Sequence, residues 1–253
     1  MKHPLIIGAG GVASYLLPVL IKAFRPQALT IVDKDRLEER NLDRQMFSPE
    51  EVGSYKADAL IRSLMLHEET VRMKTVPEWF SPELVLPDSI VDVDCIICVA
   101  DNHQARHDAL NRADELRIPC VIGGNEYFDS EAYIYYPRWK GKLGDPRVRH
   151  PELLTPDHND SPLSCTGIVQ QGTPQLAIAN FSCAAKILQL LWTHERWVNE
   201  QARKLSPETF HSVISTLPFE LTTSIHESTR HSHRDPGHFT STVARLEAEQ
   251  PAG

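Results

Sequence analysis

Short apolar runs alternate with longer amphipathic stretches along the first half of the chain. Residues 5–7 are followed by glycines and then by the apolar stretch 12–24, which predicts a strand, a tight turn and a helix. Pro18 should kink that helix or lie in its first turns. Further apolar runs predict strands at residues 28–32, 71–76, 93–99, 119–122 and 132–136.

Helical patterns separate these strands. Ser48-Pro49-Glu50-Glu51 combines a capping serine, a proline at the first position and an acidic residue at the third, so a helix is predicted from here to about Met65. A polar helix is predicted from Asn102 to about Arg117. The alternation predicts an α/β fold: a Rossmann-like, mostly parallel sheet with flanking helices and right-handed crossovers.

The second half of the chain has a different organisation. Residues 138–172 are rich in proline and polar residues, which predicts a long, mobile crossover loop. Thr173-Pro174 should then begin a long C-terminal helix, with an apolar face at Leu176, Phe181, Ala184, Ile187, Leu188 and Leu191. We expect a small hairpin within residues 210–225, a single domain over 1–225 and a disordered tail over 226–253.

Composition narrows the class of protein. The 253 residues carry a formal charge of −8, which argues against nucleic acid as the main partner. No apolar run approaches the roughly 20 residues that a membrane span needs. The N-terminus lacks a signal-peptide layout, so we expect a cytoplasmic protein.

The five cysteines do not suggest a disulfide scaffold, because their number is odd and the chain is long. Cys95 and Cys98 have the spacing of a redox or zinc motif, but they lie inside a predicted buried strand. Residues three apart in a strand point to opposite faces and cannot share a metal ion. Since no second such pair is present, no zinc is expected.

The loop Gly8-Ala9-Gly10-Gly11-Val12-Ala13 joins the first strand to the first helix. Such a loop brings backbone N–H groups and the positive end of a helix to a phosphate. Asp33, at the end of the second strand, is placed to accept hydrogen bonds from ribose hydroxyls. Because Gly8, Asp33 and Asp101 each follow the carboxyl end of a strand, they should converge. These features fit a dinucleotide as well as ATP.

Three further residues favour ATP. Arg44 offers a permanently charged, planar donor fork, and Lys56 adds a point charge. Asp101 can hold Mg²⁺, which takes oxygen ligands and bridges phosphates. A dehydrogenase needs none of these groups, although each residue alone would also fit a solvated, charged surface.

Taken together, these motifs resemble the ThiF/MoeB family, the bacterial relatives of ubiquitin-activating enzymes. The resemblance extends over residues 4–195. It rests on the glycine loop, the Asp33–Gln45 string, Lys56, Asp101-Asn102 with Arg106, and Cys165 followed by Gly167-Ile168-Val169 and Thr173-Pro174.

The resemblance implies ATP-dependent adenylation of the C-terminal glycine of a ubiquitin-like or sulfur-carrier protein. It also implies a homodimer, with a conjugating enzyme as a possible further partner. It implies Mg²⁺ bound by Asp101, the residue most needed for adenylation, and an Asp101 loop oriented by Arg106. The implied nucleotide-binding residues are Gly8, Gly10, Gly11, Asp33, Asp35, Asn41, Arg44, Gln45 and Lys56. Cys165 lies where several members carry the cysteine that receives the activated acyl group. A packing role for Cys165 stays open, whereas Cys183 is expected in the core.

The chain departs from the family pattern in two ways. The first strand begins at residue 4, so the N-terminal helix that supplies an arginine to the partner subunit's ATP is missing, and Arg138, Arg147 and Arg149 are possible substitutes. The paired zinc ligands of many members are absent as well. His226, His231, His233 and His238 suggest only adventitious metal affinity. The basic stretch 138–142 could meet an acidic partner or be a solvated loop.

Three alternatives remain. The acceptor could be a peptide, or a small-molecule or tRNA-linked carboxylate. The protein could be an NAD-dependent oxidoreductase on the same fold, which Arg44, Lys56 and Asp101 disfavour. It could also be a non-catalytic binding partner.

Overall fold

In the computed structural model, six strands form one sheet in the order β3-β2-β1-β4-β5-β6. The structure describes residues 1–66, 70–84, 86, 92–125, 130–142, 144–155 and 176–204. All neighbours pair in parallel except β5 and β6, which are antiparallel. The strands are β1 (Pro4–Ile7), β2 (Ala28–Val32), β3 (Arg72–Val76), β4 (Cys95–Cys98), β5 (Cys120–Asn125) and β6 (Ser130–Tyr135). The predicted fold class is therefore confirmed.

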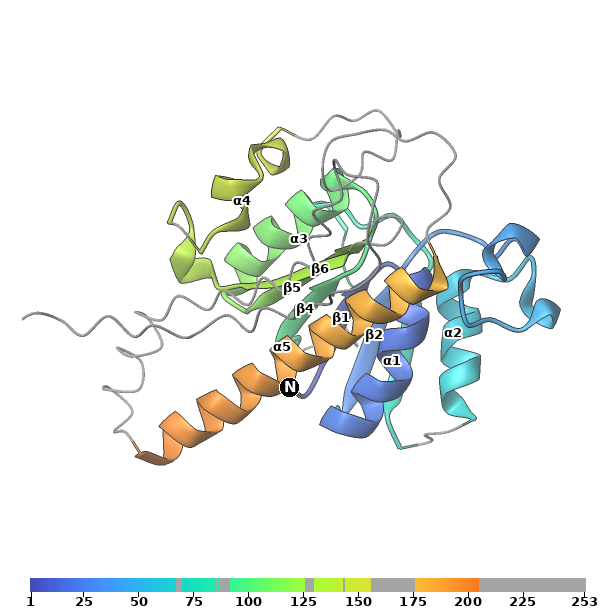
Figure 1. The fold of residues 1–253 in the computed structure, drawn as a ribbon, viewed down its shortest axis with the longest axis horizontal. Helices are drawn as coiled ribbons and strands as arrows, with labels where there is room; N and C mark the ends of the chain where they lie inside the picture. Colours follow the sequence, from blue (N-terminus) through green and yellow to red (C-terminus); the bar gives the residue numbers. More distant parts are fainter. Residues whose placement is uncertain are drawn as a thin grey trace, which may run out of the picture.

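Helices cover both faces of this sheet, because right-handed crossovers to either side of β1 place them there. The main helices are α1 (Gly11–Phe24), α2 (Lys56–Met65), α3 (His103–Leu116) and α5 (Ala177–Lys204). Figure 1 shows α1 and α5 side by side, and α5 also packs across β5 and β6. None of the helices in the described part of the chain is long and apolar enough to cross a membrane.

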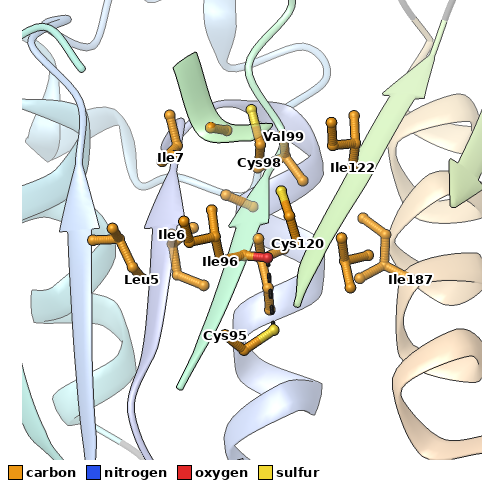
Figure 2. Packing of buried hydrophobic residues seen from close by; sticks show 14 of the residues in the cluster. Leu5, Ile6, Ile7, Cys95, Ile96, Cys98, Val99, Cys120, Ile122 and Ile187 are labelled. Carbon is orange, nitrogen blue, oxygen red and sulfur yellow. Dashed lines mark hydrogen bonds between the residues drawn. The ribbon is translucent and has the colours of Figure 1, made fainter. Parts of the chain in front are cut away.

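The core lies between the sheet and its helices. Leu5, Ile6, Ile96 and Ile97 are fully buried, as expected for strands covered on both faces. Figure 2 shows how strand side chains pack together with Ile187 of α5. At Gly123 of β5, an added Cβ would lie 2.5 Å from Ile187 Cδ1, so this glycine lets the long helix approach closely.

The predicted helix from Ser48 to Met65 is two elements. The Ser48 side chain does accept from the Glu50 N–H, but it caps only the 3₁₀ turn η2 (Pro49–Glu51). Gly53 then adopts a φ of +91°, and Tyr55 forms a β-bridge with Arg36. The helix therefore restarts at Lys56 and ends at Met65, the predicted end.

The described part of the predicted crossover loop is not irregular. Residues 137–142 and 144–155 contain η3 (Pro137–Trp139), α4 (Pro146–Arg149) and η4 (Pro151–Leu153), and they bury Trp139 and Leu153. Residues 156–175 and 205–253 lie outside the described residues, and with them Cys165, the expected hairpin and the histidine-rich tail. The domain limits therefore stay predictions.

Arg147, one of the three loop arginines predicted as possible phosphate contacts for a partner subunit, is instead a buried structural cation. Its Nε donates to Asp145 Oδ1 (2.9 Å) and its Nη1 to Asp114 Oδ2 (3.0 Å). Burial alone would lower the pKa of Arg147, but these carboxylates raise it overall. Removing either partner would leave an uncompensated buried charge.

Cys95 and Cys98 lie in the buried strand β4, and Cys183 lies in the core, as predicted. Cys95, Cys98, Cys120 and Cys183 are buried, and none of them forms a disulfide with another described residue. Burial raises the pKa of Cys95 to about 12 and that of Cys98 to about 11. No group of three potential metal ligands occurs among the described residues.

Candidate nucleotide-binding site

The glycine loop crosses the carboxyl edge of the sheet and leads directly into α1. Gly8 has a φ of +98°, and a Cβ there would lie 3.0 Å from the backbone nitrogen of Ala100. Glycine is therefore required at this position for both its backbone conformation and its close packing. An added Cβ at Gly10 meets no atom within 4 Å, so the backbone is open at the N-terminus of α1. This arrangement suits the close approach of a phosphate.

Asp33 is fixed against this loop by two backbone amides. Its Oδ2 accepts from the Ala9 N–H (2.6 Å), and its Oδ1 accepts from the Asp35 N–H (2.7 Å). Burial raises the pKa of Asp33, and the two amide hydrogen bonds offset part of that effect. The carboxylate is thus held in one orientation at the end of β2, where sequence reasoning placed a ribose acceptor.

Lys56 brings a positive charge to the same place. Its Nζ lies 3.0 Å from Asp35 Oδ2, and its side chain is only 12% exposed. The Lys56 charge is also one of the influences that lower the pKa of Asp33. Because α2 begins at Lys56, with its N–H bonded to the Asp35 carbonyl (2.8 Å), the backbone itself sets this position.

Asn41, Arg44 and Gln45 belong to one tight turn around η1 (Glu39–Asn41). Asn41 is buried, its Oδ1 accepts from the Glu38 N–H (3.0 Å), and its carbonyl accepts from the Arg44 and Gln45 N–H groups. The Arg44 guanidinium bonds the Arg40 carbonyl (2.6 Å) and Asp43 (2.8 Å). Gln45 Oε1 is buried with no hydrogen-bond partner in the described structure, which leaves an acceptor for an incoming donor.

Sequence reasoning did not foresee how this turn is attached to the rest of the site. Asn180 of α5 donates through Nδ2 to the Arg44 carbonyl (3.0 Å), and its Oδ1 accepts from Asn125 (3.0 Å). Ser14 of α1 accepts from the Met46 N–H (3.1 Å). No local motif indicates either role, because both depend on how α1 and α5 pack.

Asp101 lies just beyond β4 and is exposed. Asn102 caps α3 by accepting from the Ala105 N–H (2.8 Å), and buried Arg106 donates through Nε to the Ala100 carbonyl (3.2 Å). Arg106 therefore braces the strand end that carries Asp101. Since Gly8 contacts Ala100, the glycine loop and the Asp101 segment are adjacent, as predicted from the strand ends.

The site residues thus form one connected edge of the sheet. The glycine loop, Asp33, Asp35 and Lys56 are linked by direct contacts, and the Arg44 turn is attached through Ser14 and Asn180. The predicted acyl acceptor, Cys165, lies outside the described residues.

The chain is similar in sequence to known activating enzymes. The NEDD8-activating enzyme E1 catalytic subunit of Arabidopsis thaliana is 30% identical over 149 residues, which cover 53% of this chain and 32% of that protein. Human ubiquitin-like modifier-activating enzyme 7 is 29% identical over 145 residues, covering 54% of this chain and 14% of that protein. The chain therefore spans a third or less of the length of these relatives.

Solved structures share the fold at low sequence identity. The E. coli tRNA N6-threonylcarbamoyladenosine dehydratase TcdA superposes with a TM-score of 0.55 at 17% identity, over 77% of this chain and 88% of that one. PaaA gives a TM-score of 0.55 at 21% identity, covering 76% and 55%. E. coli MccB, crystallised with AMPCPP and MccA, gives 0.52 at 17% identity, covering 75% and 55%.

A family model covers most of the chain, including every residue assigned to the site. It spans residues 1–223 and describes the ThiF family. With the glycine loop, the oriented Asp33 and the Lys56 pair placed on one sheet edge, the chain belongs to the ThiF family.

Proposed function

We propose that the protein adenylates the C-terminal glycine of a ubiquitin-like or sulfur-carrier protein with Mg·ATP. The observation that carries the proposal is the position of Lys56, a shielded ammonium paired with Asp35 beside the ribose-type acceptor Asp33. A cation at this place suits the phosphates of ATP, and a redox dinucleotide does not require it. The names of the curated relatives, which are activating enzymes for ubiquitin-like proteins, support the same reaction.

In this proposal each part of the site has one task. Asp33 accepts from the ribose hydroxyls, and the open backbone at Gly10 with the N-terminus of α1 receives phosphate. Arg44 exchanges its bonds to Asp43 and the Arg40 carbonyl for phosphate oxygens, and Lys56 adds its charge. Asn41 keeps its side-chain amide NH₂ as a donor, while its Oδ1 accepts from the Glu38 N–H and so holds the turn. Gln45 offers its unpartnered Oε1 to a nucleotide donor.

The residues present fit a magnesium ion that arrives with the nucleotide. Asp101 is an exposed carboxylate next to the Ala100–Gly8 contact, where phosphates would lie. Mg²⁺ is commonly held by one or two carboxylates together with substrate phosphates and water. Asp101 would hold the ion, which would supply charge neutralisation for the phosphates.

The reaction follows from positioning and charge. A carboxylate oxygen of the carrier's terminal glycine attacks the α-phosphorus, the bond to the bridging oxygen breaks, and pyrophosphate leaves. The acyl-adenylate that remains is then open to a thiolate. We extend the proposal to Cys165 as that acceptor, which forms a thioester and releases AMP. We also propose that the protein acts as a homodimer and that a conjugating enzyme is one of its partners.

One alternative acceptor has specific support. E. coli MccB, whose fold is similar, was crystallised with AMPCPP and MccA, which supports a nucleotide and a second polypeptide as ligands of such a fold. Adenylation of a peptide carboxylate, rather than of a folded carrier, would use the same residues.

The proposal is tested by pyrophosphate exchange into ATP. Purified ubiquitin-like and sulfur-carrier proteins are added one at a time, each beside a matched form that lacks its last glycine. We expect exchange with one intact carrier, none with its truncated form, and none with the Asp101→Ala enzyme. Robust exchange by Asp101→Ala would overturn the assignment of the site.

A further inference from the structure

A second concave site lies at the opposite edge of the sheet. A cavity of about 520 Å³ is lined by Asp114, Arg117, Pro119, Tyr136, Pro137, Arg138 and Lys140. These residues lie where α3 ends, where β5 begins and where β6 ends, since Cys120 pairs with Tyr135. The glycine loop lies at the other end of the parallel strands, roughly 13–20 Å away for strands of this length. The cavity is therefore separate from the nucleotide site.

Arg138 is the unusual residue of this cavity. Its Nε is buried and has no hydrogen-bond partner within the described residues, and its guanidinium forms no ion pair there. The group lies over the ring of Tyr136, 4.7 Å from the centroid. Burial lowers the pKa of Arg138 and so opposes its charge. A partly buried guanidinium without an anion is costly, unlike Arg147, which has two carboxylates.

The nearby carboxylate is already engaged. Asp114 binds Lys140 (2.8 Å) and Arg147 (3.0 Å), and these bonds outweigh its burial and lower its pKa. Arg117 ends α3 with a φ of +57° and forms no ion pair with another described residue. Asp145 neutralises the charge of Arg147 by forming an ion pair with it. Arg117 and Arg138 have no such partner among the described residues, so the cavity carries an excess positive charge, although the whole protein is acidic.

Helix polarity does not cancel this charge. The cavity faces the C-terminal end of α3, which on its own would disfavour an anion. The Arg117 and Ile118 N–H groups, however, already bond the carbonyls of Ala113 and Asp114. The charged residues that line the cavity are then Arg117, Arg138, Lys140 and Asp114, and the Asp114 carboxylate is already bound by Lys140 and Arg147.

We infer that this cavity binds a small oxyanion, a phosphate or carboxylate group, held by Arg138 and Arg117 and assisted by Lys140. The planar donor fork of arginine matches both oxyanions, and the Tyr136 ring supports the Arg138 guanidinium on one side. The volume exceeds that of a bare anion and suits a ligand that carries the group on an organic body. The site is independent of the proposed adenylation.

Inorganic phosphate is the probe, and the arginine Nε–Hε signals of the full-length, ¹⁵N-labelled protein are the readout. We expect the Arg138 signal to shift saturably, with a dissociation constant of about 1 mM or below, and not with chloride at equal ionic strength. A titration with acetate at equal ionic strength tests whether the cavity binds a carboxylate group. Phosphate at the glycine loop would instead shift the Gly8–Gly11 amides, so the two sites are distinguished.

Three variants complete the test. Arg138→Gln should weaken phosphate binding by at least about tenfold, as measured from the Nε–Hε signal of Arg117. Arg117→Gln should weaken it by a smaller factor, because the Arg117 side chain is exposed. Arg72→Gln, an exposed arginine on the distant edge strand β3, is the matched control and should bind as the unchanged protein does. No saturable shift at Arg138 with either anion, or an undiminished response at Arg117 in Arg138→Gln, would overturn the inference.

Discussion

The side chain of Asn180 donates a 3.0 Å hydrogen bond to the carbonyl of Arg44, a residue 136 positions earlier in the chain. Asn180 is 1% exposed, and its other amide atom accepts from Asn125. It also lies against Gly11, where an added Cβ would approach within 2.2 Å of its Nδ2. One residue of the long helix thus holds the glycine loop, the Arg44 turn and the end of β5 in a fixed relation.

This contact predicts a coupled pair of substitutions. Asn180→Ala leaves buried polar groups unpaired and should lower the free energy of unfolding by about 1–3 kcal/mol. Gly11→Ala should cost a similar amount through overpacking. The double variant should be more stable than the sum predicts, by on the order of 1 kcal/mol, because truncating the Asn180 side chain leaves room for the new methyl group. Denaturant unfolding of all four proteins measures the coupling.

Gly10→Ala is the control for that cycle. Gly10 is the N-cap of α1, where alanine is less favourable than glycine, but its φ is −84° and no atom lies within 4 Å of an added Cβ, so the free energy of unfolding should fall by no more than about 1 kcal/mol. Strict additivity of Gly11→Ala and Asn180→Ala would contradict the proposed contact.

Lys56→Gln should weaken Mg·ATP binding by about tenfold or more while changing stability little. The Asp35 partner is 55% exposed, so the ion pair contributes at most about 1 kcal/mol. Arg62→Gln is the matched control, since Arg62 lies on the same helix and pairs with Glu51. Calorimetric titration with Mg·ATP should separate the two variants; equal losses of affinity would mean that Lys56 acts only as surface charge.

Thiol labelling of the native protein should find one fast-reacting cysteine, Cys165. The four described cysteines are buried, and burial raises the pKa of Cys95, Cys98 and Cys120, so their thiolates are scarce. Cys165→Ala should remove the fast phase at about pH 8. If a full equivalent of fast thiol persists in that variant, the reactive cysteine is another one and the acceptor role loses its basis.

His194 should make the protein less stable in mild acid. Burial first, and then the charges of Arg138 and the N-terminal amine, lower its pKa from 6.5 to about 4. Below about pH 6.5 the unfolded chain takes up a proton that the folded chain excludes, so the free energy of unfolding falls until about pH 4. This group accounts for on the order of 2–3 kcal/mol of that loss.

The measurement is denaturant unfolding between about pH 7.5 and pH 5, in the unchanged protein and in His194→Gln. The variant loses the hydrogen bond between Tyr136 Oη and His194 Nε2 (2.8 Å), so it should be less stable at neutral pH but depend less on pH. An identical pH dependence in both proteins would show that His194 is not the titrating group.

The inner strands β1, β2, β4 and β5 were predictable because each is a short, mostly apolar run that is buried on both faces. Periodicity also located α1 and α3 and the end of α2. The predicted start of α2 was wrong. Ser48 does cap a helical turn, but this turn is η2, and Gly53 separates it from α2. A local capping pattern does not report how many turns follow it.

Tertiary packing decided what the sequence could not indicate. Arg147 looks like any other basic loop residue until Asp114, Asp145 and Tyr135 are seen to surround it. Phe181 was expected on the buried face of α5 but is 57% exposed, with its ring against Tyr15. The strand-end rule placed Gly8, Asp33 and Asp101 on one edge, whereas Asn180 could not be predicted because a distant helix supplies it.

Thermal unfolding with Mg·ATP and, separately, with NAD⁺ tests the central claim most directly, because it requires no knowledge of the carrier. A ligand at about 100 times its dissociation constant adds about 2.7 kcal/mol, which is a few degrees for a domain of this size. We predict a shift with Mg·ATP, none with NAD⁺, and loss of the ATP shift in Asp101→Ala, whose exposed side chain can be removed without disturbing the core. A shift with NAD⁺ and none with Mg·ATP would contradict the adenylation site.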